Sequence, residues 1–218
     1  MIKNVIFDLD GTLVDSVAGI EFALKEAINW VLPGKSFQAK DLKRRLGPPI
    51  NQIITKLLPN ISDDTILKID QQFRLIYDQD GWKKTRLFDS TIETLIGLSR
   101  KKVGMFVATN KPSIPTGQIL ALTGVTPFLA DFISPDFNGK KTQDKSDLVY
   151  ILIKKHGLRP YNTLMVGDTI NDAQSAQSCG LDFAFAAYGY GNISDFGEYF
   201  LRYILNRPID LLNQLVKG

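Results

Sequence analysis

The chain has one cysteine and one histidine in 218 residues, and these low counts exclude several kinds of site. A single cysteine, Cys179, allows neither an internal disulfide nor a cysteine-based zinc cluster. A single histidine, His156, excludes metal sites built from several histidines and leaves any serine–histidine–aspartate triad dependent on one residue. Because His156 precedes Gly157 where a helix is expected to end, its position favours a structural role. The chemistry is therefore expected to rest on carboxylates.

The sequence also lacks long apolar runs and any concentrated block of one charge. No stretch of twenty apolar residues occurs, and the N-terminus lacks the basic-then-apolar pattern of a secretory signal. The net charge is +3, but the basic residues are scattered along the sequence. This pattern does not imply nucleic-acid binding and fits a site that attracts small anions equally well. These features predict a soluble cytoplasmic protein with no nucleic-acid or membrane partner, and they leave the oligomeric state open.

Short apolar runs alternate with helical patterns along most of the chain. Runs typical of buried strands cover residues 3–7, 103–108, 163–166 and 183–187, with a weaker one at 132–133. Helical patterns lie between them, at 91–98, 146–155 and 171–179. This alternation predicts an α/β fold with a Rossmann-like parallel sheet.

Residues 15–84 have a different character. They show helical periodicity without a convincing strand, and proline and glycine interrupt them at 33–34, 47–49 and 59. The length of the chain suits one large domain or a core with a smaller insertion, and the change of pattern here favours the insertion. We therefore expect a catalytic core of residues 1–14 and 85–218 and an inserted helical cap domain of residues 15–84.

Polar residues follow the expected strands at the points where they end. Asp8 and Asp10 follow the first strand, Thr109-Asn110-Lys111 follows the second, and Asp168, with Asp172 four residues later, follows the third. Ligands bind beyond the carboxyl ends of parallel strands, so these side chains should converge. Clustered carboxylates repel one another, which calls for a divalent cation, and ligands that are all oxygen favour Mg²⁺.

These residues resemble the motifs of the haloacid dehalogenase (HAD) superfamily. Asp8-Leu9-Asp10-Gly11-Thr12-Leu13 is similar to its first motif, Thr109 to its second and Gly167-Asp168 with Asp172 to its fourth. Lys145 is the best match for the lysine of the third motif, with Lys140 and Lys141 as alternatives.

Three further segments resemble the phosphoglycolate-phosphatase-like branch of this superfamily. They are residues 45–49, 109–112 and 188–191. The chain departs from many relatives in having Asp89-Ser90 where they have Pro-Gly, and in lacking a Lys-Pro pair in the third motif.

The resemblance implies a role for each matching residue. Asp8 would be the nucleophile that forms an aspartyl-phosphate, and Asp10 the acid/base. Thr109, Lys145 and backbone N–H groups near the nucleophile would orient the phosphate. The implied metal ligands are Asp8, Asp10 through its backbone carbonyl, Asp168 and Asp172. The implied substrate-binding residues are Gly11, Thr12, Asn110 and, from the cap, Arg45.

The sequence thus predicts a Mg²⁺-dependent phosphatase of small phosphomonoesters, similar to phosphoglycolate. A sugar phosphomutase of the same superfamily and a catalytically silent phosphate-binding regulator are the alternatives. A receiver-like signalling module is a further one, but such a module has no cap. The identity of the substrate does not follow from the sequence.

Overall fold

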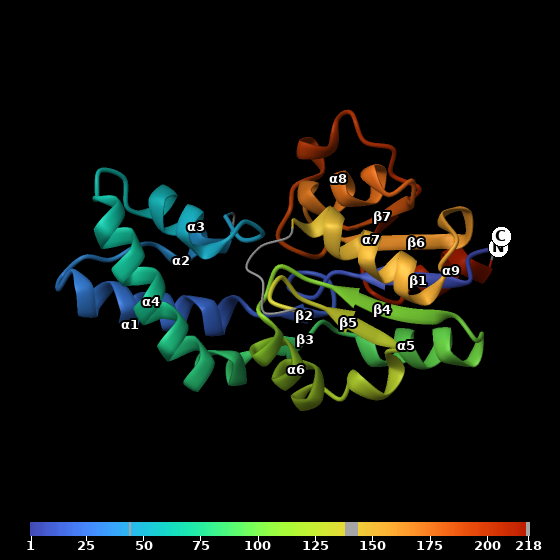
Figure 1. The fold of residues 1–218 in the computed structure, drawn as a ribbon, viewed down its shortest axis with the longest axis horizontal. Coiled ribbons are helices and arrows are strands. Elements are labelled where there is room, and N and C mark those ends of the chain that lie inside the picture. Colours follow the sequence, from blue (N-terminus) through green and yellow to red (C-terminus); the bar gives the residue numbers. More distant parts are fainter. Residues whose placement is uncertain (44, 138–143, 217–218) are drawn as a thin grey trace. The chain divides into compact units, whose positions relative to one another are not determined.

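The computed structural model describes residues 1–43, 45–137 and 144–216. The chain divides into two compact units, Met1–Asp15 with Leu87–Gly218, and Ser16–Arg86 (Figure 1). Two short strands, β2 (Val14–Asp15) and β3 (Arg86–Leu87), pair where the chain passes from one unit to the other. Among the described helices, none has the length and apolar character needed to cross a membrane.

The described part of the larger unit forms a six-stranded parallel sheet in the order β5-β4-β1-β6-β7-β8. The strands are β1 (Asn4–Phe7), β4 (Gly104–Ala108), β5 (Asp131–Ile133), β6 (Thr163–Gly167), β7 (Asp182–Ala186) and β8 (Tyr203–Leu205). Phe7 at the end of β1 is in register with Val107 of β4 and Val166 of β6. The residues that follow these three neighbouring strands therefore lie at the same edge of the sheet. The predicted α/β fold class is confirmed.

Successive side chains along each strand point to opposite faces of the sheet, and both faces pack in apolar layers. On one face, Ile6 and Met165 pack in a core cluster with Leu148 of α7 (Lys145–His156) and Ala173 of α8 (Ile170–Ser178). The next residues along β1 and β6 belong to the other face, which α5 (Thr91–Arg100) and α9 (Asp210–Val216) cover. Figure 1 shows α7 and α8 on the side of the sheet opposite to α5. Covered faces explain why these strands read as continuous apolar runs.

Helices α6 (Ser113–Leu122) and α9 and strand β8 of this unit were not expected from the sequence. Helix α6 contains Pro115, which weakens a helical pattern. The proline lies in the first turn, where its missing N–H removes no intrahelical hydrogen bond. Strand β8 is an edge strand of three residues and is too short to show periodicity.

In the smaller unit, the regular elements described before β3 are all helices. Its helices are α1 (Val17–Val31), α2 (Ala39–Lys43), α3 (Ile50–Leu57), α4 (Asp63–Gln79) and the 3-10 helix η1 (Gly81–Lys84). α1 packs along α4 and η1, and the backbones meet closely at Gly19, where a Cβ would lie 2.1 Å from the carbonyl oxygen of Gly81. Ser62 caps α4 by accepting a hydrogen bond from the Thr65 N–H.

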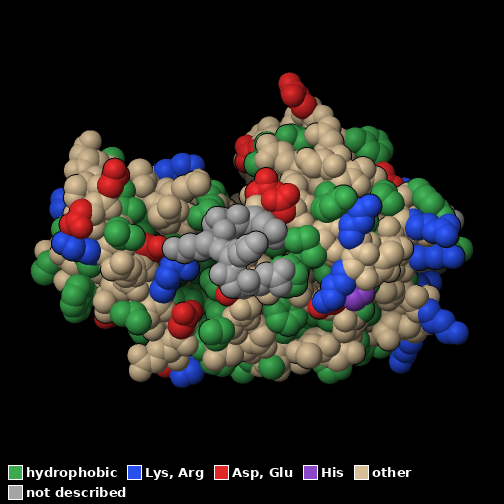
Figure 2. Space-filling view, viewed as in Figure 1, with side chains coloured by type: hydrophobic (Ala, Val, Ile, Leu, Met, Phe, Trp, Pro, Cys, Tyr) green, Lys and Arg blue, Asp and Glu red, His purple; other side chains and the backbone are tan. Residues whose placement is uncertain are grey.

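Basic side chains are spread over the face shown in Figure 2 and are interspersed with acidic ones. This distribution agrees with the scattered positions of lysine and arginine in the sequence.

Candidate active site

The segment after β1 forms a tight turn that presents two aspartates. The Asp8 N–H donates to the Val166 carbonyl oxygen (2.8 Å) and so extends the pairing of β1 with β6 by one residue. The turn then closes on Leu9, whose carbonyl oxygen accepts from the N–H groups of residues 12, 13 and 14. Gly11 makes the turn possible, because its φ of +85° is a conformation that favours glycine.

Three buried carboxylates gather beside this turn. Asp8, Asp168 and Asp172 each offer an oxygen, and these oxygens lie within 4.8 Å of one another. Asp8 is 6% exposed, and the other two are fully buried. The structure thus brings together, in the larger unit, three of the residues that the sequence suggests as metal ligands.

Lys145, the first residue of α7, supplies the positive charge of this cluster. Its Nζ lies 2.5 Å from Asp8 Oδ1 and forms a second ion pair with Asp172 Oδ1. Helix α7 is held at this end by Asp144, whose side chain accepts from the Asp147 N–H. Lys140 and Lys141, the alternatives for the lysine of the third motif, lie outside the described residues.

The negative charge of the cluster exceeds the charge of this lysine. Burial raises the pKa of Asp8 to about 7, although Lys145 acts in the opposite direction. Burial, followed by the charges of Asp172 and Asp8, raises the pKa of Asp168 well above its ordinary value. Burial alone would lower the pKa of Lys145, but the two neighbouring carboxylates outweigh it and raise that pKa. The lysine is therefore charged, and the site favours an additional cation.

The oxygens of the cluster fit a hard divalent cation. Asp168 Oδ2 accepts from the Tyr190 N–H (2.8 Å), whereas its buried Oδ1 has no hydrogen-bond partner among the described residues. Asp172 Oδ2 accepts from the N–H (2.9 Å) and the hydroxyl (2.7 Å) of Thr169. Oriented carboxylates with a free buried oxygen, and no nitrogen or sulfur in the set, match the preference of Mg²⁺. The carboxylate of Asp10 is not a member of this group, and its implied ligation through the backbone carbonyl stays a prediction.

The end of β4 contributes two further residues, Thr109 and Lys111. Thr109 is buried, and its Oγ1 accepts from the Lys111 N–H (3.1 Å). The Nζ of Lys111 lies 3.3 Å from Asp10 Oδ2. The sequence placed Lys111 at this strand end, next to Asn110, but gave it no role. Its position in the same strand-end tripeptide as Thr109 was the available signal.

A glycine-rich segment after β7 packs against both the turn and Asp168. A Cβ on Gly189 would lie 2.3 Å from the Gly11 carbonyl oxygen, and one on Gly191 would lie 1.9 Å from the Asp168 carbonyl oxygen. Only residues without a side chain allow this approach. Sequence reasoning identified residues 188–191 by resemblance and missed this packing role.

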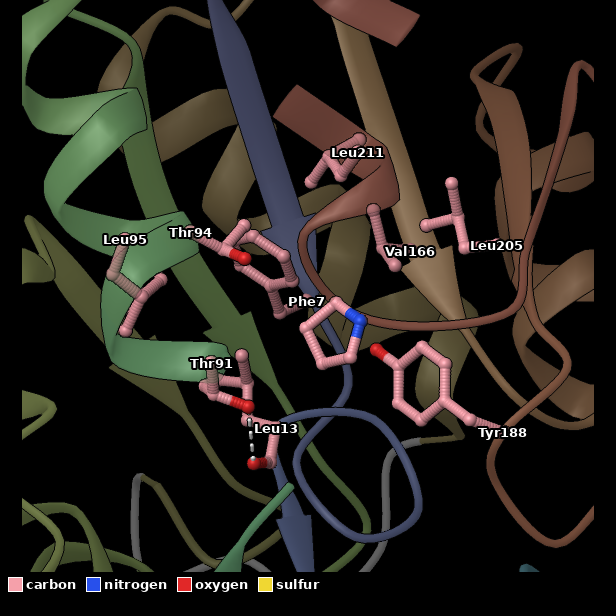
Figure 3. A pocket seen from close by; sticks show the side chains of 10 residues that line it. Phe7, Leu13, Thr91, Thr94, Leu95, Val166, Tyr188, Leu205 and Leu211 are labelled. Carbon is pink, nitrogen blue, oxygen red and sulfur yellow. Dashed lines mark hydrogen bonds between the residues drawn. The ribbon is translucent and has the colours of Figure 1, made fainter. Parts of the chain in front are cut away.

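Tyr188 of the same segment stabilises the turn after β1 through a hydrogen bond. Its hydroxyl donates to the Thr12 carbonyl oxygen (2.9 Å), and burial raises its pKa. With Phe7 and Val166, it lines a small, mostly apolar cavity of ≈ 10 Å³ (Figure 3). A cavity of this size holds about one water molecule, so it is not a substrate site.

The predicted substrate-binding residues have different environments. The N–H groups of Gly11 and Thr12 donate within the turn, to Val14 and Leu9 respectively, whereas Thr12 Oγ1 is buried without a partner among the described residues. Asn110 is half-buried at the end of β4.

Arg45 belongs to the smaller unit, where its guanidinium donates to the Asp41 carbonyl oxygen (2.8 Å). It lines a pocket of ≈ 250 Å³ with Ser36, Phe37, Gln38, Asp41, Lys56 and Leu57. Its contact with substrate stays a prediction.

The fold and this cluster agree with a comparison against protein families. The model of the haloacid dehalogenase-like hydrolase family matches residues 5–186, and the chain belongs to this family. The prediction of the family from its motifs is confirmed.

The relatives place the chain among phosphatase-type enzymes of the family. It is 31% identical over 198 residues to a phosphoglycolate phosphatase of Vibrio vulnificus, covering 88% of this chain and 86% of that protein. It is 30% identical over 189 residues to a tyrosine-protein kinase, PtkA, of Mycobacterium tuberculosis, covering 86% of this chain and 62% of that protein. A haloacid dehalogenase-like hydrolase from Streptococcus pneumoniae has a similar structure, with a TM-score of 0.88, 26% identity and 98% of each chain covered.

Proposed function

We propose that the chain is a Mg²⁺-dependent phosphatase that hydrolyses small phosphomonoesters through an aspartyl-phosphate on Asp8. The observation that carries this proposal is the buried group of Asp8, Asp168 and Asp172 around one lysine, with Asp168 Oδ1 left without a partner among the described residues. The comparisons support a phosphatase-type enzyme, and the geometry supports the cation and the nucleophile.

Asp8, Asp168, Asp172 and the backbone carbonyl of Asp10 would hold the cation. When bound, Mg²⁺ neutralises charge between the attacking carboxylate and the phosphate. Tyr190 and Thr169 orient two of these carboxylates through hydrogen bonds to one oxygen of each. Carboxylates fixed in this way need little reorganisation on binding.

Asp8 is placed to attack phosphorus. One carboxylate oxygen forms a bond to phosphorus while the bond from phosphorus to the leaving oxygen breaks. Lys145 pairs with Asp8 Oδ1 and so fixes the orientation of this carboxylate. Its positive charge balances the negative charge of the incoming phosphate. Thr109, with a buried hydroxyl at the end of β4, is the proposed contact to a phosphate oxygen.

Asp10 completes the cycle as acid and then base. It gives a proton to the leaving oxygen in the first step, so that an alcohol departs. It then takes a proton from the water that attacks phosphorus, and the bond between phosphorus and Asp8 breaks to release phosphate. This second half distinguishes hydrolysis from transfer to another acceptor, which a phosphomutase or a kinase would perform.

The substrate is proposed to be a small phosphorylated acid similar to phosphoglycolate. The name of the Vibrio relative supports this class, and Arg45 could bind a carboxylate bidentately. We propose that the helical insertion, predicted as residues 15–84, acts as the cap that selects the substrate and excludes water. A cytoplasmic location stays a prediction.

The first experiment measures phosphate release from a panel of small phosphomonoesters. We expect release by the wild type with Mg²⁺, loss of it with EDTA, and a loss of about 10³-fold or more in Asp8→Asn, because the nucleophile is removed. Asp147→Asn, an exposed carboxylate on α7, is the matched control and should keep full activity.

Three results would contradict the proposal. Release that persists in Asp8→Asn would exclude Asp8 as the nucleophile. Absence of release by well-folded wild type, with or without a sugar bisphosphate activator, would favour the regulator, whereas transfer only with that activator would favour the mutase.

A further inference from the structure

Lys111 lies beside Asp10 in the larger unit, and the family motifs give it no role. Its Nζ is 3.3 Å from Asp10 Oδ2, and its side chain is only 8% exposed. A lysine loses hydration when it is buried to this extent, so an anionic partner stabilises it. The pairing with Asp10 is therefore a built feature of the site.

The backbone of Lys111 is fixed on both sides. Its N–H donates to Thr109 Oγ1 (3.1 Å), and its carbonyl oxygen accepts from Thr116 Oγ1 (3.3 Å). Thr109 follows β4, and Thr116 lies in α6. The ammonium thus extends from a backbone anchored to a strand end and to a helix, which suits a group that holds another residue in place.

The two carboxylate oxygens of Asp10 have different surroundings. Oδ2 faces Lys111, whereas Oδ1 is buried without a hydrogen-bond partner among the described residues. A buried oxygen without a partner is costly, so a ligand atom is the natural candidate to complete it. The leaving oxygen of a phosphomonoester and the attacking water are the atoms that an acid/base must reach.

We propose that Lys111 is a positioning residue that holds Asp10 through Oδ2 and leaves Oδ1 as the atom that transfers the proton. This inference rests on the proposed function. In the first step the proton passes from Oδ1 to the leaving oxygen as its bond to phosphorus breaks. In the second step Oδ1 takes a proton from water as the bond between Asp8 and phosphorus breaks. Lys111 keeps all of its own protons.

The leaving group separates this role from direct phosphate binding. An alkoxide is a poor leaving group and needs the proton from Asp10, whereas 4-nitrophenolate departs without it. A positioning residue for the proton transfer therefore affects alkyl phosphates selectively. A residue that binds phosphate affects all phosphomonoesters alike.

The test compares kcat/KM for an alkyl phosphomonoester and for 4-nitrophenyl phosphate, with Mg²⁺ present. General acid catalysis contributes about 10²–10⁴-fold, so in Lys111→Met we expect a loss of about 10–100-fold for the alkyl ester and less than about threefold for the aryl ester. Lys111→Arg should recover part of the loss, because a guanidinium also pairs with Asp10. Inhibition by inorganic phosphate should stay within about twofold of the wild type.

Lys101→Met is the matched control, since Lys101 is an exposed lysine at the end of α5. It should leave both kcat/KM values unchanged. Thermal unfolding of each variant reports whether it is folded, and Lys111→Arg keeps the inference testable if Lys111→Met unfolds.

Equal losses for the two esters in Lys111→Met, or weaker inhibition by inorganic phosphate, would overturn the inference. Asp10→Asn, measured in parallel, separates it from the proposed function. If Asp10→Asn keeps wild-type activity, the proposed function fails. If Asp10→Asn loses activity selectively toward the alkyl ester and Lys111→Met does not, the positioning role alone fails.

Discussion

Ser90 adopts the left-handed backbone conformation directly before α5, with a φ of 65°. A residue with a Cβ is strained there by about 1–2 kcal/mol, whereas glycine is not. This is the position at which many relatives have glycine in a Pro-Gly pair. The Ser90 hydroxyl offers no compensation, because its buried oxygen has no hydrogen-bond partner among the described residues. The replacement of this glycine by Ser90 therefore introduces local backbone strain before α5.

Ser90→Gly should stabilise the protein. We expect the free energy of unfolding, measured with urea, to rise by about 0.5–1 kcal/mol, since relief of strain exceeds the entropic cost of glycine. Ser99→Gly is the matched control, because Ser99 is exposed within the same helix and glycine there should destabilise by about 0.5–1 kcal/mol. A loss of stability in both variants would show that Ser90 is not strained.

Helix α7 carries Lys145 at its first residue and is tied to the sheet at its last turn. Asp131, the first residue of β5, accepts hydrogen bonds at Oδ2 from Lys155 Nζ and His156 Nε2, each at 2.7 Å. The ring of His156 also lies 4.9 Å from that of Phe106. These contacts agree with the structural role that the sequence suggested for His156.

Asp131 should make stability depend on pH in the acidic range. Burial acts to raise its pKa, but the hydrogen bonds from Lys155 and His156 outweigh it and lower that pKa. A lowered pKa in the folded state contributes stability above the unfolded pKa of about 3.9, and this contribution is lost as pH falls. Because the side chains of Asp131 and Lys155 are partly exposed to solvent, Asp131→Asn should cost less than about 1 kcal/mol near neutral pH.

Urea unfolding of the wild type and Asp131→Asn between about pH 7 and pH 3.5 checks this expectation. The difference in free energy should shrink toward the acidic end, while kcat/KM stays that of the wild type. A difference that is the same at both ends would mean that packing, and not the charge of Asp131, sets it.

The fold concentrates negative charge from distant stretches of the chain in one buried place. Asp8 follows β1, Asp168 follows β6, and Asp172 lies in the first turn of α8. The raised pKa values of Asp8 and Asp168 mean that these carboxylates oppose folding when they are ionised and no cation is bound. The protein therefore gives up some stability for a site ready to bind a cation.

Without bound metal, the free energy of unfolding should decrease as pH rises. A raised pKa in the folded state contributes stability below the unfolded pKa of about 3.9, and this is lost as pH rises through the folded pKa, which is about 7 for Asp8. In EDTA, the melting temperature should fall between about pH 5 and pH 8. Mg²⁺ at about a hundredfold excess over its Kd should restore about 2.7 kcal/mol.

Asp8→Asn separates this effect from general instability at high pH. With one carboxylate removed, the fall in EDTA should be smaller, and stabilisation by Mg²⁺ should be weaker than in the wild type. A melting temperature in EDTA that is flat from about pH 5 to pH 8 in the wild type would contradict the expectation.

The strands at the centre of the sheet could be predicted because they are buried on both faces and read as apolar runs. The segments at 3–7 and 163–166 agree with β1 and β6 to within about a residue at each end. Helix α6 could not be predicted in this way, since Pro115 and Gly117 break its pattern and only packing reveals it. The motif aspartates could be predicted because Asp8, Asp10 and Asp168 follow strands and Asp172 comes four residues after Asp168.

The amino-acid sequence alone was enough for the parallel fold class and the family. It also predicted that Asp8 and Asp168 would lie close together, and it favoured Lys145 over Lys140 and Lys141 as their lysine partner. These predictions depend on apolar runs and on the spacing of motif residues, which can be read directly from short stretches of sequence. The pairing of Lys111 with Asp10, the support of the turn by Tyr188, and the approach of Gly189 to Gly11 depended on the folded structure. They join residues far apart in the chain, and such contacts leave no periodic pattern in the sequence because tertiary packing, rather than local structure, brings them together.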